Sequence, residues 1–118
     1  MITMQRGDIV LVELPQVAGI SGHEQIGKRP ALVVHNDATS SNLSVIMIVP
    51  VTSNLSAQNF AHTISIQPSQ QNGLNMPSVL LIFQLRAIDK RRIVKKIGII
   101  EAPILEQVSA ELKALLGL

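Results

Sequence analysis

The run Pro30-Ala31-Leu32-Val33-Val34-His35 decides the fold class of this chain. It is short, apolar almost throughout and rich in β-branched side chains, which favour strands. An apolar run of this length without alternation indicates a strand whose two faces are both covered. We therefore expect residues 30–35 to form a strand inside the core of a mainly β protein.

Short strands are predicted on both sides of this run. Residues 8–14 alternate, with Ile9, Leu11 and Glu13 on one face and Val10, Val12 and Leu14 on the other. The other predicted strands are residues 44–51, 62–66, 78–88, which is the longest, and 93–100, the last two being joined by a tight segment at 89–92.

The periodicity changes near the end of the chain. From Pro103 the apolar residues recur with the spacing of a helix, and Gly117 is a typical helix stop. Many short strands followed by one amphipathic helix predict a small antiparallel barrel of the SH3-like type with a C-terminal α-helix, in a single domain spanning residues 1–118. The predicted buried face of the helix consists of Ile104, Leu105, Val108, Leu112, Leu115 and Leu116.

Three loops interrupt the predicted strands. Residues 16–28 form a polar, glycine-containing loop that is long enough to be a functional flap. Residues 36–42 form a turn cluster, and Asn72-Gly73 is a strong turn signal.

Composition excludes several classes of protein. Cysteine is absent, so disulfides, thiol catalysis and thiolate metal sites are excluded. No signal peptide or membrane-spanning run is recognisable, and we expect a cytoplasmic protein. The three histidines, His23, His35 and His62, lack the spacing of metal sites, and there is no phosphate loop or serine hydrolase motif. We expect no metal and no cofactor.

The net charge of +2 hides a local cluster of cations. Such a cluster suits either a phosphate-contacting surface or a solvated strand edge that opposes aggregation, and both remain open. Aromatic residues make up only 2% of the chain, so an RNA-binding surface would have to depend mainly on polar groups, arginine planes and backbone. The cluster consists of Arg86, Lys90, Arg91, Arg92, Lys95 and Lys96.

Arg29 is the one candidate for phosphate chemistry that remains. It lies where the long loop meets the apolar strand, and its planar donor fork suits phosphate. On the residues alone, an ion pair with Glu13 or Glu24 is the simpler explanation. Thr52 and Ser53 follow the third strand, where hydroxyls are usually turn-forming.

Four segments in order resemble MazF/PemK-like toxins. Gly22-His23-Glu24-Gln25-Ile26-Gly27-Lys28-Arg29-Pro30 is similar to their Gly-x-Glu-Gln-x-Gly-x-Arg-Pro segment. The other three are Arg6-Gly7-Asp8-Ile9-Val10, Val49-Pro50-Val51-Thr52-Ser53, and Gln84-Leu85-Arg86-Ala87-Ile88-Asp89-Lys90-Arg91-Arg92-Ile93. Together they extend over almost the whole chain.

The resemblance implies an endoribonuclease toxin of a toxin–antitoxin pair. Such toxins are homodimers that cut single-stranded RNA at specific sequences without metal, leaving a 2′,3′-cyclic phosphate and a 5′-hydroxyl. A cognate MazE-like antitoxin neutralises them. The catalytic pair carries over to Arg29 and Thr52. The substrate-binding positions carry over to His23, Glu24, Gln25, Ser53, Gln84 and Arg86.

The chain departs from the family pattern at several positions. His23 replaces a small hydroxyl residue, Phe83 stands where a polar residue is common, and Ala87 replaces a threonine. These changes leave the catalytic pair in place but put the cut-site sequence in doubt. The rival hypothesis is a CcdB-like toxin, which shares the barrel but poisons DNA gyrase without cleaving anything.

Overall fold

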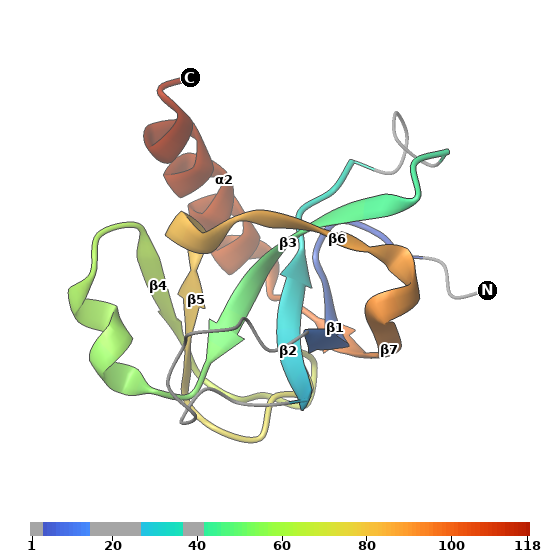
Figure 1. Cartoon of the computed structure of the whole chain (residues 1–118). Helices are drawn as coiled ribbons and strands as arrows, with labels where there is room; N and C mark the ends of the chain where they lie inside the picture. Colours follow the sequence, from blue (N-terminus) through green and yellow to red (C-terminus); the bar gives the residue numbers. More distant parts are fainter. Residues whose placement is uncertain (1–3, 15–26, 37–41) are drawn as a thin grey trace, which may run out of the picture.

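The computed structural model describes residues 4–14, 27–36 and 42–118 (Figure 1). Seven strands, three short 3₁₀ helices and one α-helix are formed by these residues. The strands are β1 (Asp8–Leu14), β2 (Gly27–Val33), β3 (Val45–Thr52), β4 (Thr63–Ile66), β5 (Ser78–Leu81), β6 (Arg86–Asp89) and β7 (Ile93–Ile99). The helices are η1 (Leu55–Asn59), η2 (Ile82–Gln84), η3 (Lys90–Arg92) and α2 (Ala102–Leu116).

The strands form one antiparallel sheet in the order β4-β5-β3-β2-β1-β7, and β6 pairs with the first half of β3. This confirms the predicted mainly β fold with a C-terminal helix. The sheet is only loosely barrel-like. Among the strands that the structure describes, no ladder joins β7 to β4 or β6 and closes the ring. In Figure 1, β6 and η3 curl across one side of the sheet while α2 covers the other.

The sheet separates the two larger of the three apolar clusters formed by the described residues. One core lies between the sheet and α2, which contributes the buried Val108. The other lies on the opposite face, under β6. Both faces of the second half of β2 are buried, as predicted for the run that begins at Pro30, because Leu32 enters the first core while Ala31 and Val33 enter the second.

The predicted strand 78–88 is broken by η2. Between the pairs Ile48–Arg86 and Val51–Leu80, the chain advances three residues on β3 but six on the side of β5 and β6. Three residues, the length of η2, are therefore left out of the ladder. The cause is Pro50. Met47 turns its carbonyl toward β2, where it accepts from the N–H of Val34 at 3.1 Å. Since backbone groups alternate along a strand, Pro50 faces the η2 side, where it has no N–H to offer.

Two further predictions differ from the structure. β2 begins at Gly27, before the predicted start at Pro30, so Arg29 lies inside a strand instead of at a loop junction. The extension follows from the β1 ladder, which continues as far as Leu14 and Gly27. In α2, Leu116 is 54% exposed and is not part of the buried face, whereas Leu115 beside it packs against the core.

A polar network fixes the loop between β4 and β5 to the start of α2. Asn72 is fully buried, and its amide donates to the carbonyl of Gln67 at 2.9 Å and to Glu101 Oε1 at 3.2 Å. The hydroxyl of Ser69 donates to Glu101 Oε2 at 2.6 Å. That hydrogen bond lowers the pKa of Glu101 from its ordinary value of 4.5, against a smaller opposing effect of desolvation.

The same loop touches β7 backbone to backbone. A Cβ built on Gly73 would lie 2.0 Å from the carbonyl oxygen of Ile97, and one on Gly98 would lie 2.3 Å from the backbone of Asn72. Gly73 also has a φ of +72°, a region that L-residues rarely adopt. The predicted turn at Asn72-Gly73 is therefore confirmed, and it is a turn that only glycine fits.

We predict that Gly73→Ala lowers the free energy of unfolding by about 3 kcal/mol or more, because the new methyl group must displace backbone atoms. Gly117→Ala is a matched control, since Gly117 has the same φ of +72° but nothing within 4 Å of a Cβ. It should cost only about 1 kcal/mol, the conformational part of the effect. Urea denaturation measures both, and equal losses would show that the backbone contact adds nothing.

We also predict that Glu101→Gln lowers Tm by about 5 °C at neutral pH, because it weakens a charge-assisted hydrogen bond. A carboxylate whose pKa is lowered by folding stabilises the protein above its ordinary pKa, and this stabilisation is lost as the pH falls through the lower, folded-state value. The Tm gap between Glu101→Gln and the parent chain should therefore shrink below about pH 4.5. Ser69→Ala should show the same trend, and a gap independent of pH would contradict this account.

Candidate functional site

Arg29 is the third residue of β2, held in the middle of the sheet. Its backbone pairs with Val12 of β1, whose side chain is fully buried. Cross-strand partners share a face, so Arg29 lies on the same side of the sheet as Val12 and the core under β6. The residue is half-buried, and its Nε is shielded from solvent.

Thr52 is the last residue of β3. It is half-buried, and its Oγ1 accepts a hydrogen bond from the backbone N–H of Asn54 at 3.1 Å. This turn fixes the hydroxyl oxygen and leaves its proton available to donate elsewhere. Asn54 was not among the residues selected from the sequence, although a threonine two residues before an asparagine at a strand end is a typical turn signal.

The register places Arg29 and Thr52 at matching positions on one face of the sheet. The last pair of the β2–β3 ladder is Ala31 with Pro50, and two residues further along each strand lie Arg29 and Thr52. Thr52 lies four residues after Ile48 on β3, and side chains an even number of residues apart on a strand share a face. Thr52 therefore lies on the face of Ile48, a member of the core under β6. The cation and the hydroxyl therefore lie on one face of the sheet, at the end of the same ladder.

Glu13, one of the two ion-pair partners considered for Arg29, pairs with Lys28 in the ladder. It is the next residue after Val12, so its side chain leaves the opposite face of the sheet. The other partner considered, Glu24, lies outside the described residues, as do His23 and Gln25 and most of the predicted flap.

The remaining substrate-binding candidates do not all lie on the same face of the sheet. Arg86 is exposed and pairs with Ile48, which places it on the Arg29–Thr52 face. Gln84 is exposed at the end of η2. Ser53 instead lines a cleft of about 700 Å³ on the opposite face, together with Pro30 and Val51.

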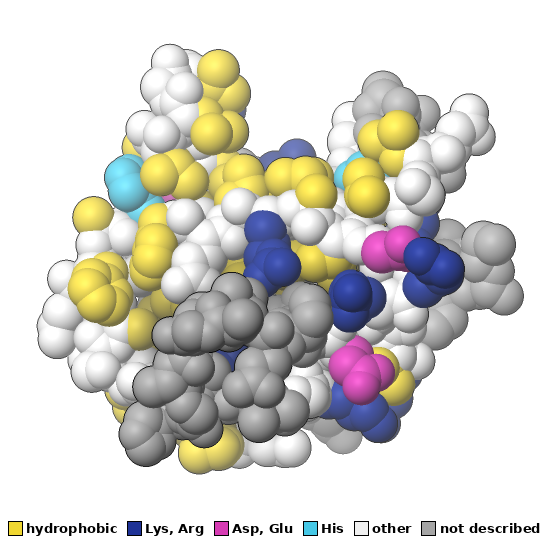
Figure 2. Space-filling model, viewed as in Figure 1, with side chains coloured by type: hydrophobic (Ala, Val, Ile, Leu, Met, Phe, Trp, Pro, Cys, Tyr) yellow, Lys and Arg dark blue, Asp and Glu magenta, His cyan; other side chains and the backbone are white. Residues whose placement is uncertain are grey.

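The cationic cluster predicted from the sequence is divided between the two sides. Lys95 pairs with Leu11, and both line the 700 Å³ cleft, whereas Lys96 pairs with Val10 of the core under β6 and its Nζ lies 3.1 Å from Oδ1 of the buried Asp8. The arginines of η3 lie with Arg86 on the other side, where Figure 2 shows Lys and Arg side chains over β6 and η3. The cluster is therefore not one patch.

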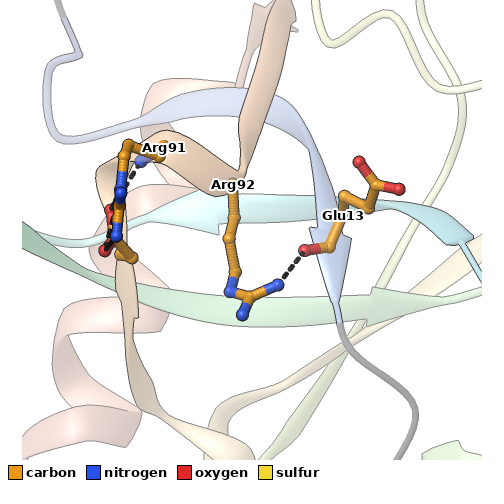
Figure 3. Close-up of polar contacts among 4 residues, drawn as sticks. Glu13, Arg91 and Arg92 are labelled. Atoms are coloured by element: carbon orange, nitrogen blue, oxygen red, sulfur yellow. Dashed lines mark hydrogen bonds and ion pairs between the residues drawn. The ribbon is translucent and has the colours of Figure 1, made fainter.

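Within η3, the two arginines differ in their surroundings (Figure 3). Arg91 is held by Asp89 through Nη2 to Oδ2 at 2.9 Å, and the hydrogen bond from its side chain lowers the pKa of Asp89 to about 2. Arg92 extends toward the end of β1, and its Nη1 donates to the carbonyl of Glu13 at 3.5 Å. These residues line a shallow cleft of about 280 Å³.

The described histidines have structural contacts. Nδ1 of the buried His35 accepts from the N–H of Met47 at 3.4 Å, and His62 Nδ1 lies 2.9 Å from Glu111 Oε1. Within residues 4–14, 27–36 and 42–118, no three His, Asp or Glu side chains gather in one group. No helix in the described part of the chain is long and apolar enough to cross a membrane. Metal independence stays a prediction.

Comparison with known proteins places the geometry in a family. Residues 5–116 match the family described as PemK-like, MazF-like toxin of type II toxin-antitoxin system. The endoribonuclease MazF of Staphylococcus saprophyticus is 28% identical over 115 residues, covering 98% of this chain and 92% of the relative.

Two solved structures from Deinococcus radiodurans have the same fold. MazF alone is 28% identical, with a TM-score of 0.75 and full coverage of both chains. A MazE–MazF structure contains a chain that is 29% identical, with a TM-score of 0.75 and coverage of 98% of this chain and 96% of that one. Since the family pattern extends over nearly the whole sequence, this chain belongs to the PemK-like, MazF-like toxins of type II toxin–antitoxin systems.

Proposed function

We propose that this protein is an endoribonuclease toxin that cleaves single-stranded RNA, without metal, by attack of a 2′-hydroxyl on the adjacent phosphate. The observation that carries the proposal is the placement of Arg29 and Thr52 on one face at the end of the β2–β3 ladder. The P–O2′ bond forms as the P–O5′ bond breaks. The 2′-hydroxyl loses its proton and the leaving oxygen gains one, so the products are a 2′,3′-cyclic phosphate and a 5′-hydroxyl.

Arg29 stabilises the charge that develops in this reaction. In-line attack places negative charge on the phosphoryl oxygens and on the leaving oxygen, and a guanidinium can hold two oxygens at once. Because Arg29 is half-buried in a strand paired on β1, little reorganisation is needed when the charge appears. Its shielded surroundings also strengthen the interaction relative to one in bulk water.

Thr52 orients the scissile phosphate. Its oxygen is already hydrogen-bonded to the N–H of Asn54, so its own proton points elsewhere and can be donated to a phosphoryl oxygen. A single donor of this kind contributes less than the cation does, because it carries no net charge.

We assign recognition of the RNA to residues around Arg29 and Thr52. Arg86 shares its face and suits a phosphate, while Gln84 suits the edge of an unstacked base. His23, Glu24 and Gln25 complete the proposed RNA-binding set, and Ser53 is left out of it because it lines the cleft on the opposite face.

The proposed partners follow the relatives. The Deinococcus radiodurans toxin has been solved with MazE, which supports a MazE-like antitoxin as the cognate partner of this chain. We further propose a homodimer that acts in the cytoplasm. A CcdB-like gyrase poison would need neither the arginine nor the threonine at this position.

We predict that Arg29→Ala lowers kcat on a defined single-stranded RNA by about 10²-fold or more, because a preorganised charge donor is removed. Thr52→Ala should lower kcat by roughly 10-fold, while Thr52→Ser, which keeps the hydroxyl, should stay within about threefold of the parent chain. Steady-state cleavage of a fluorescent RNA measures all three.

Arg6→Ala is a charge-matched control, since Arg6 donates to Ser109 of α2 at 2.7 Å, on the helix side of the sheet. It should leave kcat unchanged. Cleavage by Arg29→Ala at the parent rate would overturn the catalytic assignment.

Mapping of the cut ends tests the reaction itself. With EDTA present, the protein should cleave a long RNA at specific sites and leave 5′ ends that polynucleotide kinase labels without prior phosphatase treatment, because those ends carry a free hydroxyl. Loss of cleavage in EDTA, or 5′-phosphate ends, would contradict the proposed mechanism. Gyrase-dependent DNA breaks without RNA cleavage would favour the rival toxin class.

A further inference from the structure

Both phenylalanines of this chain lie on its surface. Phe60 and Phe83 are its only residues of the Phe, Trp and Tyr types, and they are 62% and 39% exposed. Their ring centroids are 5.7 Å apart at an interplanar angle of 61°, an edge-to-face pair. A single exposed apolar residue needs no explanation, but here every such ring of the protein is gathered at one exposed place.

The backbone holds the two rings in place. Phe60 follows η1, and its N–H donates to the carbonyl of Ala57 at 3.1 Å. Ala57 packs with Val79 and Leu81 of β5, which fastens η1 to the sheet. The hydroxyl of Thr63 donates to the carbonyl of Phe60 at 2.8 Å. The ring is therefore carried by a braced turn.

His62 joins the second ring to the first. It has a φ of +58°, which is uncommon for a residue other than glycine and persists only where the surroundings enforce it. Its carbonyl accepts from the N–H of Phe83 at 3.3 Å, and its Nδ1 lies 2.9 Å from Glu111 of α2. His62, which lies between η1 and β4, thus connects η2 and α2 at the point where Phe83 lies beside Phe60.

The aromatic pair flanks the proposed catalytic face. Thr52 pairs with Val79, so the two share a face, and η1 packs on that face through Ala57. In the other direction along η2 and β6, Phe83 is followed by the exposed Gln84 and Arg86. Figure 2 shows hydrophobic side chains exposed where η1 and β4 lie, and Lys and Arg side chains where β6 and η3 cross the same face.

We propose that Phe60 and Phe83 form a stacking site for one unpaired nucleobase of the RNA, next to Gln84. The proposal rests on the proposed function, because the base belongs to the RNA that Arg29 and Thr52 cleave. Bases stack on aromatic faces regardless of their identity, and an adjacent amide supplies both a donor and an acceptor for the edge of the base. The site therefore contributes to affinity through the rings and to sequence preference through Gln84.

A nucleobase fits this surface better than an apolar protein side chain. The rings are continuous with Gln84 and Arg86, so stacking, edge-reading and phosphate-binding groups follow one another over four consecutive residues. Single-stranded RNA presents the same three features in each nucleotide. The aromatic pair adds stacking to the polar groups, arginine planes and backbone on which an RNA-binding surface of this composition was expected mainly to depend.

The test compares the effect of removing individual bases from the RNA in the parent chain and in a variant without the Phe83 ring. Once the cut site is mapped, each nucleotide around it is replaced in turn by an abasic nucleotide, and KM and kcat are measured for the parent chain and for Phe83→Leu. At one position, loss of the base should raise KM of the parent about 10-fold, and the same loss should have almost no effect in Phe83→Leu. Phe83→Tyr, which keeps a ring, should behave like the parent.

Phe60→Leu provides a second, independent variant, and Leu116→Ala controls for loss of an exposed apolar side chain elsewhere, on α2. If loss of the base and loss of the aromatic ring have additive effects at every position while RNA is still cleaved, the stacking site is overturned and the proposed function stands. Unchanged RNA kinetics combined with weaker antitoxin binding or an altered native mass would overturn it in favour of a protein contact. If the parent chain neither binds nor cleaves single-stranded RNA, both the stacking site and the proposed function fail.

Discussion

The rest of the structure depends on the burial of β3 on both faces and its pairing on both edges. Val49 and Val51 enter the core beneath α2, while Ile46 and Ile48 enter the core beneath β6. On one edge β3 pairs with β2, and on the other with β6 and then β5. A strand constrained in this way cannot slip by one residue without exposing both apolar sets, so its register is strongly determined.

The proposed site begins where this constraint ends. At Thr52 the double burial stops, and the chain turns away through Asn54. A polar side chain at that position is fixed by the strand behind it and remains only half-buried. Arg29 occupies the matching position on β2. Rigid strands that deliver polar groups to a rim provide the preorganisation that charge stabilisation requires.

Much of the fold could be predicted because its signals are local. The alternation in β1, the apolar run of β2 and the helical spacing after Pro103 each depend on neighbours in the sequence. The break at η2 could not be predicted from its own residues. It follows from Pro50 on a strand that is distant in the sequence, which removes one ladder donor.

The same distinction applies to the candidate site. Arg29 and Thr52 were identified by resemblance, and their juxtaposition required the β2–β3 register. Ser53 was expected to bind the substrate, but it follows the last residue of β3 and lines the cleft with Val51, on the face opposite Thr52. Phe60 carried no signal, since its position beside Phe83 depends on η1 and on the conformation of His62.

Gly73 and Gly98 each lie against backbone atoms, of Ile97 and Asn72 respectively, and this has an evolutionary consequence. A clash with a side chain can be relieved by a second mutation that shortens the side chain, whereas a clash with a peptide group cannot. Descendants of this chain should therefore retain both glycines together, with no compensating pair of changes available. Divergence should accumulate instead among the exposed side chains around the Arg29–Thr52 face, where substitutions leave the fold intact.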